Sequence, residues 1–334
     1  MKRIFRHTLL ALTSLLLLST GLSGCAGTAQ DDTPSGTEPP ASDAVTADAV
    51  TESITPLLPA EAPTAEQIAD HEKLLLWPQD NIPYLIENEE KGLMPTIRAY
   101  LCEGAESAVV IFPGGGYFQL SDESEGVAIA NAYNDAGFSA FVVNYRYEPY
   151  DGAAILADGQ RAIQYVRYFA DEFGVNPDKI ALCGFSAGGH LSVMVAEHPV
   201  TDNIAGDVIG AVRSTPDACI LAYPVTTLGE GTFETMPGIF LGENIGNAEE
   251  TAKYSYPHAI DTMPPTFVFY SALDAFVNFE ANSIAFADAM TAAGRDVVIR
   301  EYADGGHGIG LGTQYKDYRA WHADSVTFLR ERGF

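Results

Sequence analysis

The chain has 334 residues, of which 45 are acidic and 18 are basic, and its formal net charge at neutral pH is −27. A charge this negative repels nucleic-acid phosphates and anionic lipid headgroups, which argues against nucleic-acid binding and against electrostatic membrane binding. The length suits one domain of ordinary size with short extensions, and no internal repeat is visible.

Residues 1–24 have the pattern of a bacterial export signal. Three basic residues stand near the start, an apolar run covers residues 9–18, and small residues follow as far as Cys25. The apolar run is too short to span a membrane as a mature helix. The tetrapeptide Leu22-Ser-Gly-Cys25 resembles the lipobox of bacterial lipoproteins, which implies that Cys25 is lipidated after cleavage. The alternative is an ordinary signal peptide with an incidental cysteine.

Residues 25–65 are expected to form a disordered tether. The stretch is rich in Thr, Ala, Asp, Pro and Gly, and it carries seven acidic residues and no basic one. Too little apolar surface is present to offset the entropy of ordering, and like charges extend the chain. We therefore expect an extracytoplasmic protein that a lipid on Cys25 anchors to the cell envelope. Loss of the leader leaves 15 basic and 45 acidic residues, a net charge of −30.

Residues 66–334 are predicted to form one α/β domain. Runs rich in β-branched and aromatic residues alternate with longer helical patterns, which is typical of a mostly parallel, twisted sheet with helices on both faces. The expected strands cover residues 97–102, 107–112, 139–145, 179–183, 218–223, 266–271 and 296–302. The expected helices cover residues 125–136, 157–173, 187–197, 279–293 and 315–332.

Residues 226–264 interrupt this alternation, because they contain five glycines and no strong period. Open α/β sheets bind ligands beyond the carboxyl ends of their strands, and this excursion follows such an end. Two interpretations stand: the segment lines a substrate pocket, or it is a surface insertion without contact to substrate.

Ser186 is the candidate nucleophile. It stands in Gly184-Phe-Ser-Ala-Gly188, between the expected strand 179–183 and the expected helix 187–197. The sharp turn of a nucleophile elbow needs very small residues two positions before and after the serine, and both glycines meet that need. The alternative is an ordinary serine in a glycine-rich turn.

The run Pro113-Gly-Gly-Gly116 directly follows the expected strand 107–112. Glycines allow the backbone to turn its N–H groups toward a ligand, as an oxyanion hole at this position requires. The expected donors are the N–H groups of Gly115, Gly116 and Ala187. The alternative is a simple glycine-rich turn.

Asp274 and His307 complete the candidate site, because each follows one of the last two expected strands. The chain order Ser, Asp, His is that of α/β-hydrolases. Asp158 precedes the serine and is expected to be structural, and Asp304 stands too close to His307 in the chain to orient it well. His190 and His198, in and after the expected helix that follows the elbow, are expected to pack or to face solvent, and His258 and His322 have no partner at a suitable topological position.

Cysteine usage indicates neither a disulfide framework nor a metal site. Cys102, Cys183 and Cys219 are odd in number and stand in apolar runs, where buried free thiols are expected. A disulfide between two of them is the alternative. No Cys/His spacing suggests zinc, and the expected chemistry needs no cofactor.

From about residue 85 to the C-terminus, the chain resembles bacterial acetyl-esterase-like α/β-hydrolases. This group contains acetylxylan and related carbohydrate esterases and lies near the hormone-sensitive-lipase-like enzymes. The matching segments are Phe112-Pro-Gly-Gly-Gly-Tyr117, Asn144-Tyr-Arg146, Gly184-Phe-Ser-Ala-Gly-Gly-His-Leu191, Tyr223-Pro-Val225, Pro264-Pro-Thr-Phe267, Asn282-Ser283 and Gly305-Gly-His-Gly308.

Two departures from the group bear on function. Lipase-like relatives often have His where this chain has Pro113, as the carbohydrate-esterase-like members do, and this favours sugar esters. Many members have two adjacent aspartates at the acid, whereas this chain has Leu273 before Asp274, so one candidate acid remains.

The resemblance implies a serine esterase acting on short acyl esters, acetyl above all, carried on small molecules or oligosaccharides. A peptidase or another acyl hydrolase is the alternative within the class, since the same parts serve amide hydrolysis. A surface binding protein that has lost turnover is the alternative from another class. The sequence carries no signal for an oligomeric state.

Overall fold

The computed structural model describes residues 60–334, except 88–91, 230, 233 and 234. The expected leader, Cys25 and the tether as far as residue 59 lie outside the described residues. Helix α1 (Ala65–Ala69) follows at the start of the expected domain, and the Thr64 hydroxyl caps it by accepting from the Gln67 N–H. No helix in the described part of the chain is both long and apolar enough to cross a membrane.

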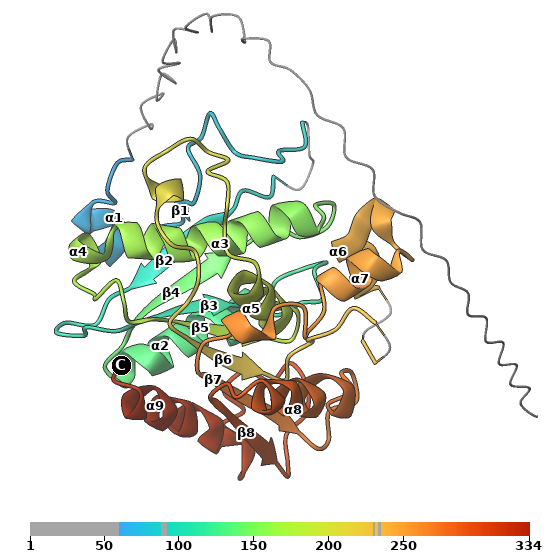
Figure 1. Ribbon diagram of the computed structural model, residues 1–334. Helices are drawn as coiled ribbons and strands as arrows, with labels where there is room; N and C mark the ends of the chain where they lie inside the picture. Colours follow the sequence, from blue (N-terminus) through green and yellow to red (C-terminus); the bar gives the residue numbers. More distant parts are fainter. Residues whose placement is uncertain (1–59, 88–91, 230, 233–234) are drawn as a thin grey trace, which may run out of the picture. The chain divides into compact units, whose positions relative to one another are not determined.

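One eight-stranded sheet organises the domain (Figure 1), in the order β1-β2-β4-β3-β5-β6-β7-β8. Strand β2 runs antiparallel to β1 and β4, and the other neighbours are parallel. The strands are β1 (Leu74–Leu75), β2 (Thr96–Tyr100), β3 (Ala108–Phe112), β4 (Ser139–Asn144), β5 (Ile180–Phe185), β6 (Ala218–Ala222), β7 (Thr266–Ser271) and β8 (Val297–Tyr302). The seven expected strands are therefore confirmed to within two residues at each end, and β1 was not predicted.

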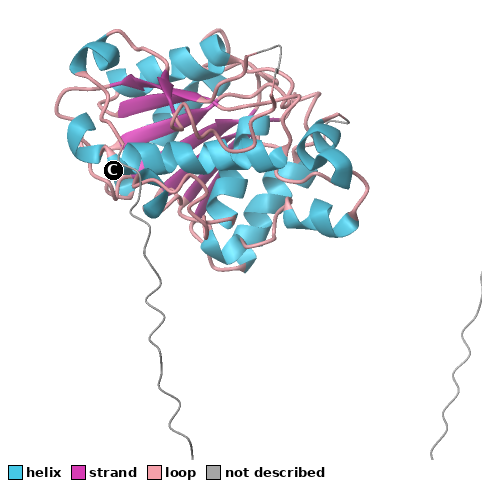
Figure 2. Ribbon diagram, turned by 90° about the horizontal axis from the view of Figure 1, so that it is seen from above, coloured by secondary structure: helices cyan, strands magenta, loops and turns pink. Residues whose placement is uncertain are grey.

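Two apolar cores lie on the two faces of the sheet, because successive side chains of a buried strand point to opposite sides. On β3, Val110 packs in the core beneath α3 (Gly152–Tyr168), α5 (Ala187–Glu197) and α8 (Ala285–Ala292). Its neighbour Val109 packs in the core beneath α2 (Ala128–Asp135) and α9 (Trp321–Glu331). Figure 2 shows helices on both sides of the strands, and Figure 1 shows α3 and α5 side by side. The expected α/β architecture is confirmed.

Several helix boundaries differ from those expected. The helix expected at 157–173 begins five residues earlier, where the Asp151 side chain accepts from the Ala153 N–H, and it breaks at Phe169 before α4 (Ala170–Phe173). The helix expected at 315–332 begins at Trp321. The helices expected at 125–136 and 279–293 each open with a π-helical turn, η1 (Asp122–Val127) and η5 (Glu280–Ile284), ahead of α2 and α8.

The segment 226–264 contains two short helices that were not expected, α6 (Met236–Leu241) and α7 (Ala248–Lys253). The same segment contains two 3-10 turns, η3 (Gly242–Asn244) and η4 (Ile260–Thr262). Two more occur elsewhere in the described chain, η2 (Ile209–Ala211) and η6 (Tyr318–Ala320).

Asp158 is structural, as expected. Its carboxylate is fully buried, pairs with the Arg146 guanidinium at 2.7 Å, and accepts the Trp77 indole N–H at 2.8 Å. Breaking such a buried pair by removing one partner costs about 3–5 kcal/mol, because the other charge is left uncompensated. This ion pair therefore holds the segment after β4 against α3, and the Trp77 bond holds the segment before β2 there as well.

Candidate active site

Ser186 lies on a sharp turn between β5 and α5. Its φ of +52° is strained for a residue with a side chain, which is typical of a nucleophile elbow. A Cβ added at Gly184 would lie 2.3 Å from the Gly188 carbonyl oxygen, and one added at Gly188 would lie 2.1 Å from the Phe112 carbonyl oxygen. Both glycines are therefore required by close backbone contact, which supports the elbow interpretation over an ordinary turn.

His307 lies between Ser186 and Asp274, although the three residues are far apart in the chain. Its Nε2 is 2.8 Å from Ser186 Oγ, and its Nδ1 is 2.7 Å from Asp274 Oδ2. With the proton on Nδ1, the ring donates to Asp274 and Nε2 accepts from the Ser186 hydroxyl. The residues chosen from chain order thus form one hydrogen-bonded chain, in which Ser186 can attack while His307 accepts its proton.

The loop after β7 fixes the Asp274 carboxylate. Its Oδ1 accepts the backbone N–H groups of Phe276 and Val277, at 2.9 and 3.0 Å, so that Oδ2 faces His307. The Asp274 side chain is only 1% exposed, whereas His307 is 14% exposed. The acid is therefore held in one orientation, and the imidazole reaches solvent and substrate.

The glycine loop after β3 turns back beside Ser186. Gly115 and Gly116 have φ values of +132° and +64°, and the Gly115 carbonyl accepts from the N–H groups of Phe118 and Gln119. Ala187 is the first residue of α5, where a backbone N–H has no acceptor within the helix. The structure thus gathers the three residues predicted as oxyanion donors around Ser186, and their role stays a prediction.

A cavity of about 210 Å³ opens onto Ser186 and His307. Apolar side chains make up much of its wall, among them Phe118, Val225, Met236, Phe276 and Val277. Met236 belongs to α6, so the segment 226–264 lines this cavity. This agrees with the interpretation that the segment lines a pocket rather than forming a surface insertion alone. The rings of Phe118 and Phe276 are 42% and 65% exposed, and they form an apolar rim.

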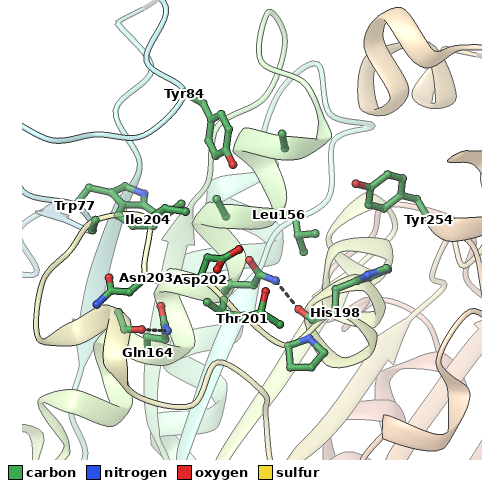
Figure 3. Close-up of a pocket in the computed structure, with 17 residues that line it drawn as sticks. Trp77, Tyr84, Leu156, Gln164, His198, Thr201, Asp202, Asn203, Ile204 and Tyr254 are labelled. Carbon is green, nitrogen blue, oxygen red and sulfur yellow. Dashed lines mark hydrogen bonds between the residues drawn. The ribbon is translucent and has the colours of Figure 1, made fainter. Parts of the chain in front are cut away.

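A separate hollow of about 250 Å³ lies over α3 and shares no residue with this cavity (Figure 3). Tyr84, Tyr254 and the loop 198–205 line it together with α3. Burial lowers the pKa of its one histidine, His198, to about 4, so that ring is neutral under ordinary conditions. None of the candidate nucleophile, base or acid stands there, and the chemistry belongs to the cavity at Ser186.

The other titratable candidates have structural partners, as expected. His190 is buried between the Tyr117 hydroxyl and the Tyr254 carbonyl, and burial lowers its pKa to about 4. Asp304 accepts backbone N–H groups from Lys316 to Tyr318. These N–H bonds lower the pKa of Asp304 and engage the segment ahead of α9, so Asp304 is not the partner of His307.

The expected free thiols are present at all three described cysteines. The expected burial is found for Cys183 on β5 and Cys219 on β6. It is wrong for Cys102, which is partly exposed because β2 ends at Tyr100, two residues before it. Among the described residues, no group of three His, Cys, Asp or Glu side chains could hold a metal ion.

Sequence reasoning missed Glu125, which lines the same cavity as Ser186 and His307. Its side chain is buried, and its carboxylate accepts the Gly114 N–H at 2.8 Å and the Tyr223 hydroxyl at 2.6 Å. Burial raises the pKa of Glu125, while these two bonds and the charge of His307 oppose the rise. Glu125 belongs to a short run of acidic residues and to no recognisable motif. Its place at the cavity is therefore seen only from how it packs in the fold.

The fold and this geometry agree with the family comparison, in which the model described as BD-FAE matches residues 100–290, more than half of the chain. The chain belongs to the BD-FAE family. The match covers Ser186 and Asp274 and ends within α8, before His307.

Curated relatives of this BD-FAE member include an acetylxylan esterase from Xylanibacter ruminicola, 32% identical over 213 residues. Another is endo-1,4-β-xylanase B from Butyrivibrio fibrisolvens, 29% identical over 223 residues. The matches cover 63% and 64% of this chain, but only 42% and 34% of the relatives. The chain therefore spans less than half the length of these relatives.

Among solved structures, an acetyl ester-xyloside bifunctional hydrolase from Caldicellulosiruptor lactoaceticus is similar with a TM-score of 0.74 and 32% identity. The likeness covers 79% of this chain and 97% of that one. The predicted likeness to α/β-hydrolase esterases is thus confirmed, and the domain has the α/β-hydrolase fold.

Proposed function

We propose that the protein is a serine esterase that hydrolyses short-chain carboxylic esters, acetyl esters above all, on carbohydrates. The observation that carries the proposal is the hydrogen-bonded chain from Asp274 through His307 to Ser186, at the mouth of a small cavity. Such a chain turns a weak hydroxyl nucleophile into an effective one at neutral pH.

In the proposed reaction, His307 takes the Ser186 proton as Oγ attacks the ester carbonyl, and Asp274 holds the imidazolium. The N–H groups of Gly115, Gly116 and Ala187 bind the oxyanion of the tetrahedral intermediate. His307 then protonates the leaving alcohol. Water attacks the resulting acyl-enzyme with His307 as base again, which restores Ser186 and releases the acid.

The substrate proposal rests on several observations together. The cavity is small, and Val225 and Met236 narrow it with apolar surface. Phe118 and Phe276 at the rim offer flat apolar faces to the alcohol part of an ester. Pro113 follows the carbohydrate-esterase pattern, and relatives are named for acetylxylan and xylan hydrolysis. An acetylated neutral oligosaccharide suits all of these features and the acidic surface.

Chain-length profiling tests the acyl half of the proposal. In a small pocket, one methylene changes transition-state binding by roughly 1–3 kcal/mol. Butyrate has two more methylenes than acetate, so we expect kcat/KM on p-nitrophenyl esters to fall about thirtyfold or more from acetate to butyrate, and further to octanoate. Acetate release from acetylated xylo-oligosaccharides tests the carbohydrate half. A preference for octanoate, or peptide cleavage without ester hydrolysis, would contradict the substrate assignment and leave the Ser186 geometry standing.

Labelling of Ser186 with a fluorophosphonate probe distinguishes a serine hydrolase from a binding protein without turnover. A peptidase and an esterase would both react with the probe, and the substrate panel distinguishes these two. A binding protein without turnover would not react. The intact hydrogen-bonded chain at Ser186 counts against a lost activity.

We also propose that the protein is a lipoprotein of the cell envelope, held by lipid on Cys25. Several acyl chains hold a protein far more firmly on a bilayer than one chain does. Cys25→Ser is therefore expected to move the protein from the membrane fraction to the soluble or secreted fraction, with unchanged esterase activity of the purified domain. Fractionation with antibody detection measures this. Membrane retention of the variant would indicate an uncleaved leader or another anchor.

A further inference from the structure

Glu125 is a buried carboxylate without the arginine partner that two other buried acids of the described domain have. Asp158 pairs with Arg146, and Asp207 pairs with Arg161. Glu197 also has no arginine partner, and burial raises its pKa to about 8. Glu125 keeps two hydrogen bonds to its carboxylate instead, so the fold provides for its ionised form.

Both hydrogen bonds of Glu125 lead to the parts that surround Ser186. The Gly114 N–H belongs to the glycine loop just before Gly115. A Cβ added at Gly114 would lie 2.6 Å from Glu125 Oε2 and 3.1 Å from Ser186 Cβ, so the carboxylate lies close to the nucleophile. The carboxylate therefore fixes the start of the loop that carries the predicted oxyanion donors.

The second bond connects Glu125 with the loop of the base. The Tyr223 hydroxyl donates to Glu125 and accepts the Gly310 N–H at 3.3 Å, three residues after His307. The Tyr223 ring also lies against the His307 ring, with centroids 4.8 Å apart. A change at Glu125 is therefore transmitted to the imidazole through one side chain.

The charge of Glu125 acts mainly on His307. The titratable groups that face it are Tyr145 just after β4, Cys183 on β5, Tyr223 just after β6 and Tyr318 in η6, and burial raises the pKa of each. All four stay neutral while the enzyme works. On η1 itself, Asp122 pairs with Arg98, and Glu123 is exposed. Among the described groups around Glu125, His307 is the one whose positive charge opposes the rise in its pKa.

We propose that Glu125 is a positioning residue for the hydrolysis assigned to Ser186 and His307, and that it acts in its ionised form. It holds the glycine loop and Tyr223 in place, and its negative charge stabilises the imidazolium that forms when the proton moves from Ser186 Oγ to His307 Nε2. The inference rests on the proposed esterase function.

Glu125→Gln tests the charge with little change of shape, because glutamine can still accept the Gly114 N–H. We expect kcat on p-nitrophenyl acetate to fall about tenfold or more, with KM within about twofold. We also expect the acid limb of the kcat/KM profile to move to lower pH by about half a unit or more. The variant has no Glu125 carboxylate to protonate and no negative charge that favours the imidazolium.

Tyr223→Phe should move the acid limb in the opposite direction. This variant keeps the carboxylate but removes a hydrogen bond that lowers the pKa of Glu125. Glu125 would then take up a proton at higher pH, so activity is lost earlier as the pH falls. Opposite shifts in the two variants are not expected from a residue that merely supports the fold. If Glu125→Gln does not fold, the Tyr223→Phe profile decides.

Glu123→Gln is the matched control, since it removes the same charge from an exposed residue of the same turn. Its kcat should stay within about twofold of the wild type, and its acid limb should not move. The inference is overturned if Glu125→Gln behaves like this control. It is also overturned if the acid limb of the kcat/KM profile stays in place in both Glu125→Gln and Tyr223→Phe while only the melting temperature falls. Wild-type protein with neither hydrolysis nor fluorophosphonate labelling would overturn the proposed function itself, and this inference with it.

Discussion

Replacing Ser186 with alanine is expected to lower kcat by about 10⁴-fold or more while the fold stays intact. The Ser186 hydroxyl contacts the His307 imidazole and contributes no bond within the core. Alanine fits the same turn, because the close contacts of the elbow arise at Gly184 and Gly188. Steady-state kinetics on p-nitrophenyl acetate measure the loss of kcat, and thermal melting followed by circular dichroism tests whether the fold is intact.

A suitable control for this experiment is Ser124→Ala, which removes an exposed hydroxyl on η1. It should retain wild-type kcat and wild-type melting. Residual activity of a tenth or more in Ser186→Ala would show that another residue is the nucleophile.

Replacing Asp274 with asparagine is expected to lower kcat by up to roughly 10⁴-fold, with a smaller effect on KM. Asparagine can still accept the N–H groups of Phe276 and Val277, so the loop should keep its shape. The asparagine amide would face the His307 ring and favour the tautomer with its proton on Nε2. That tautomer cannot accept the proton of Ser186.

The control here is Asp261→Asn, at an exposed position in η4, which should change neither kcat nor KM. Asp304→Asn should act mainly on the segment ahead of α9, whose N–H groups Asp304 binds. If Asp304→Asn abolished turnover and Asp274→Asn were mild, the acid would be assigned wrongly.

The strands could be predicted from the sequence because a parallel strand that is buried on both faces has a distinctive local composition. β3 and β5 are short apolar runs that are buried at every position, and β6 and β7 share this pattern. The π-helical start of α2 and the early start of α3 could not be predicted in this way. Gly152 begins α3 where the chain packs tightly against Phe240 of α6, a contact that depends on tertiary structure.

The residues of the candidate site likewise divide into those predicted from the sequence and those that depend on tertiary contacts. Ser186 and the glycine loop carry local constraints, since tight backbone turns need glycine at particular positions. Asp274 and His307 could be placed by topology, because each follows a strand at the same edge of the sheet. Glu125 has neither signal. The exposed Glu123 and the buried Glu125 are two residues apart in one acidic run, and only packing distinguishes them.

The contacts of Trp77 and Leu76 bear on the modular evolution of this domain. Both lie outside the family match, yet the Trp77 indole binds Asp158 and the Leu76 carbonyl accepts from Arg161 at 2.7 Å. At the other end, β8 and His307 also follow the match. A gene fusion that carried residues 100–290 alone would keep the Arg146–Asp158 and Arg161–Asp207 ion pairs but would remove one hydrogen-bond partner each from Asp158 and Arg161, and it would omit His307. A segment that keeps these contacts and His307 therefore begins ahead of Leu76 and extends beyond β8.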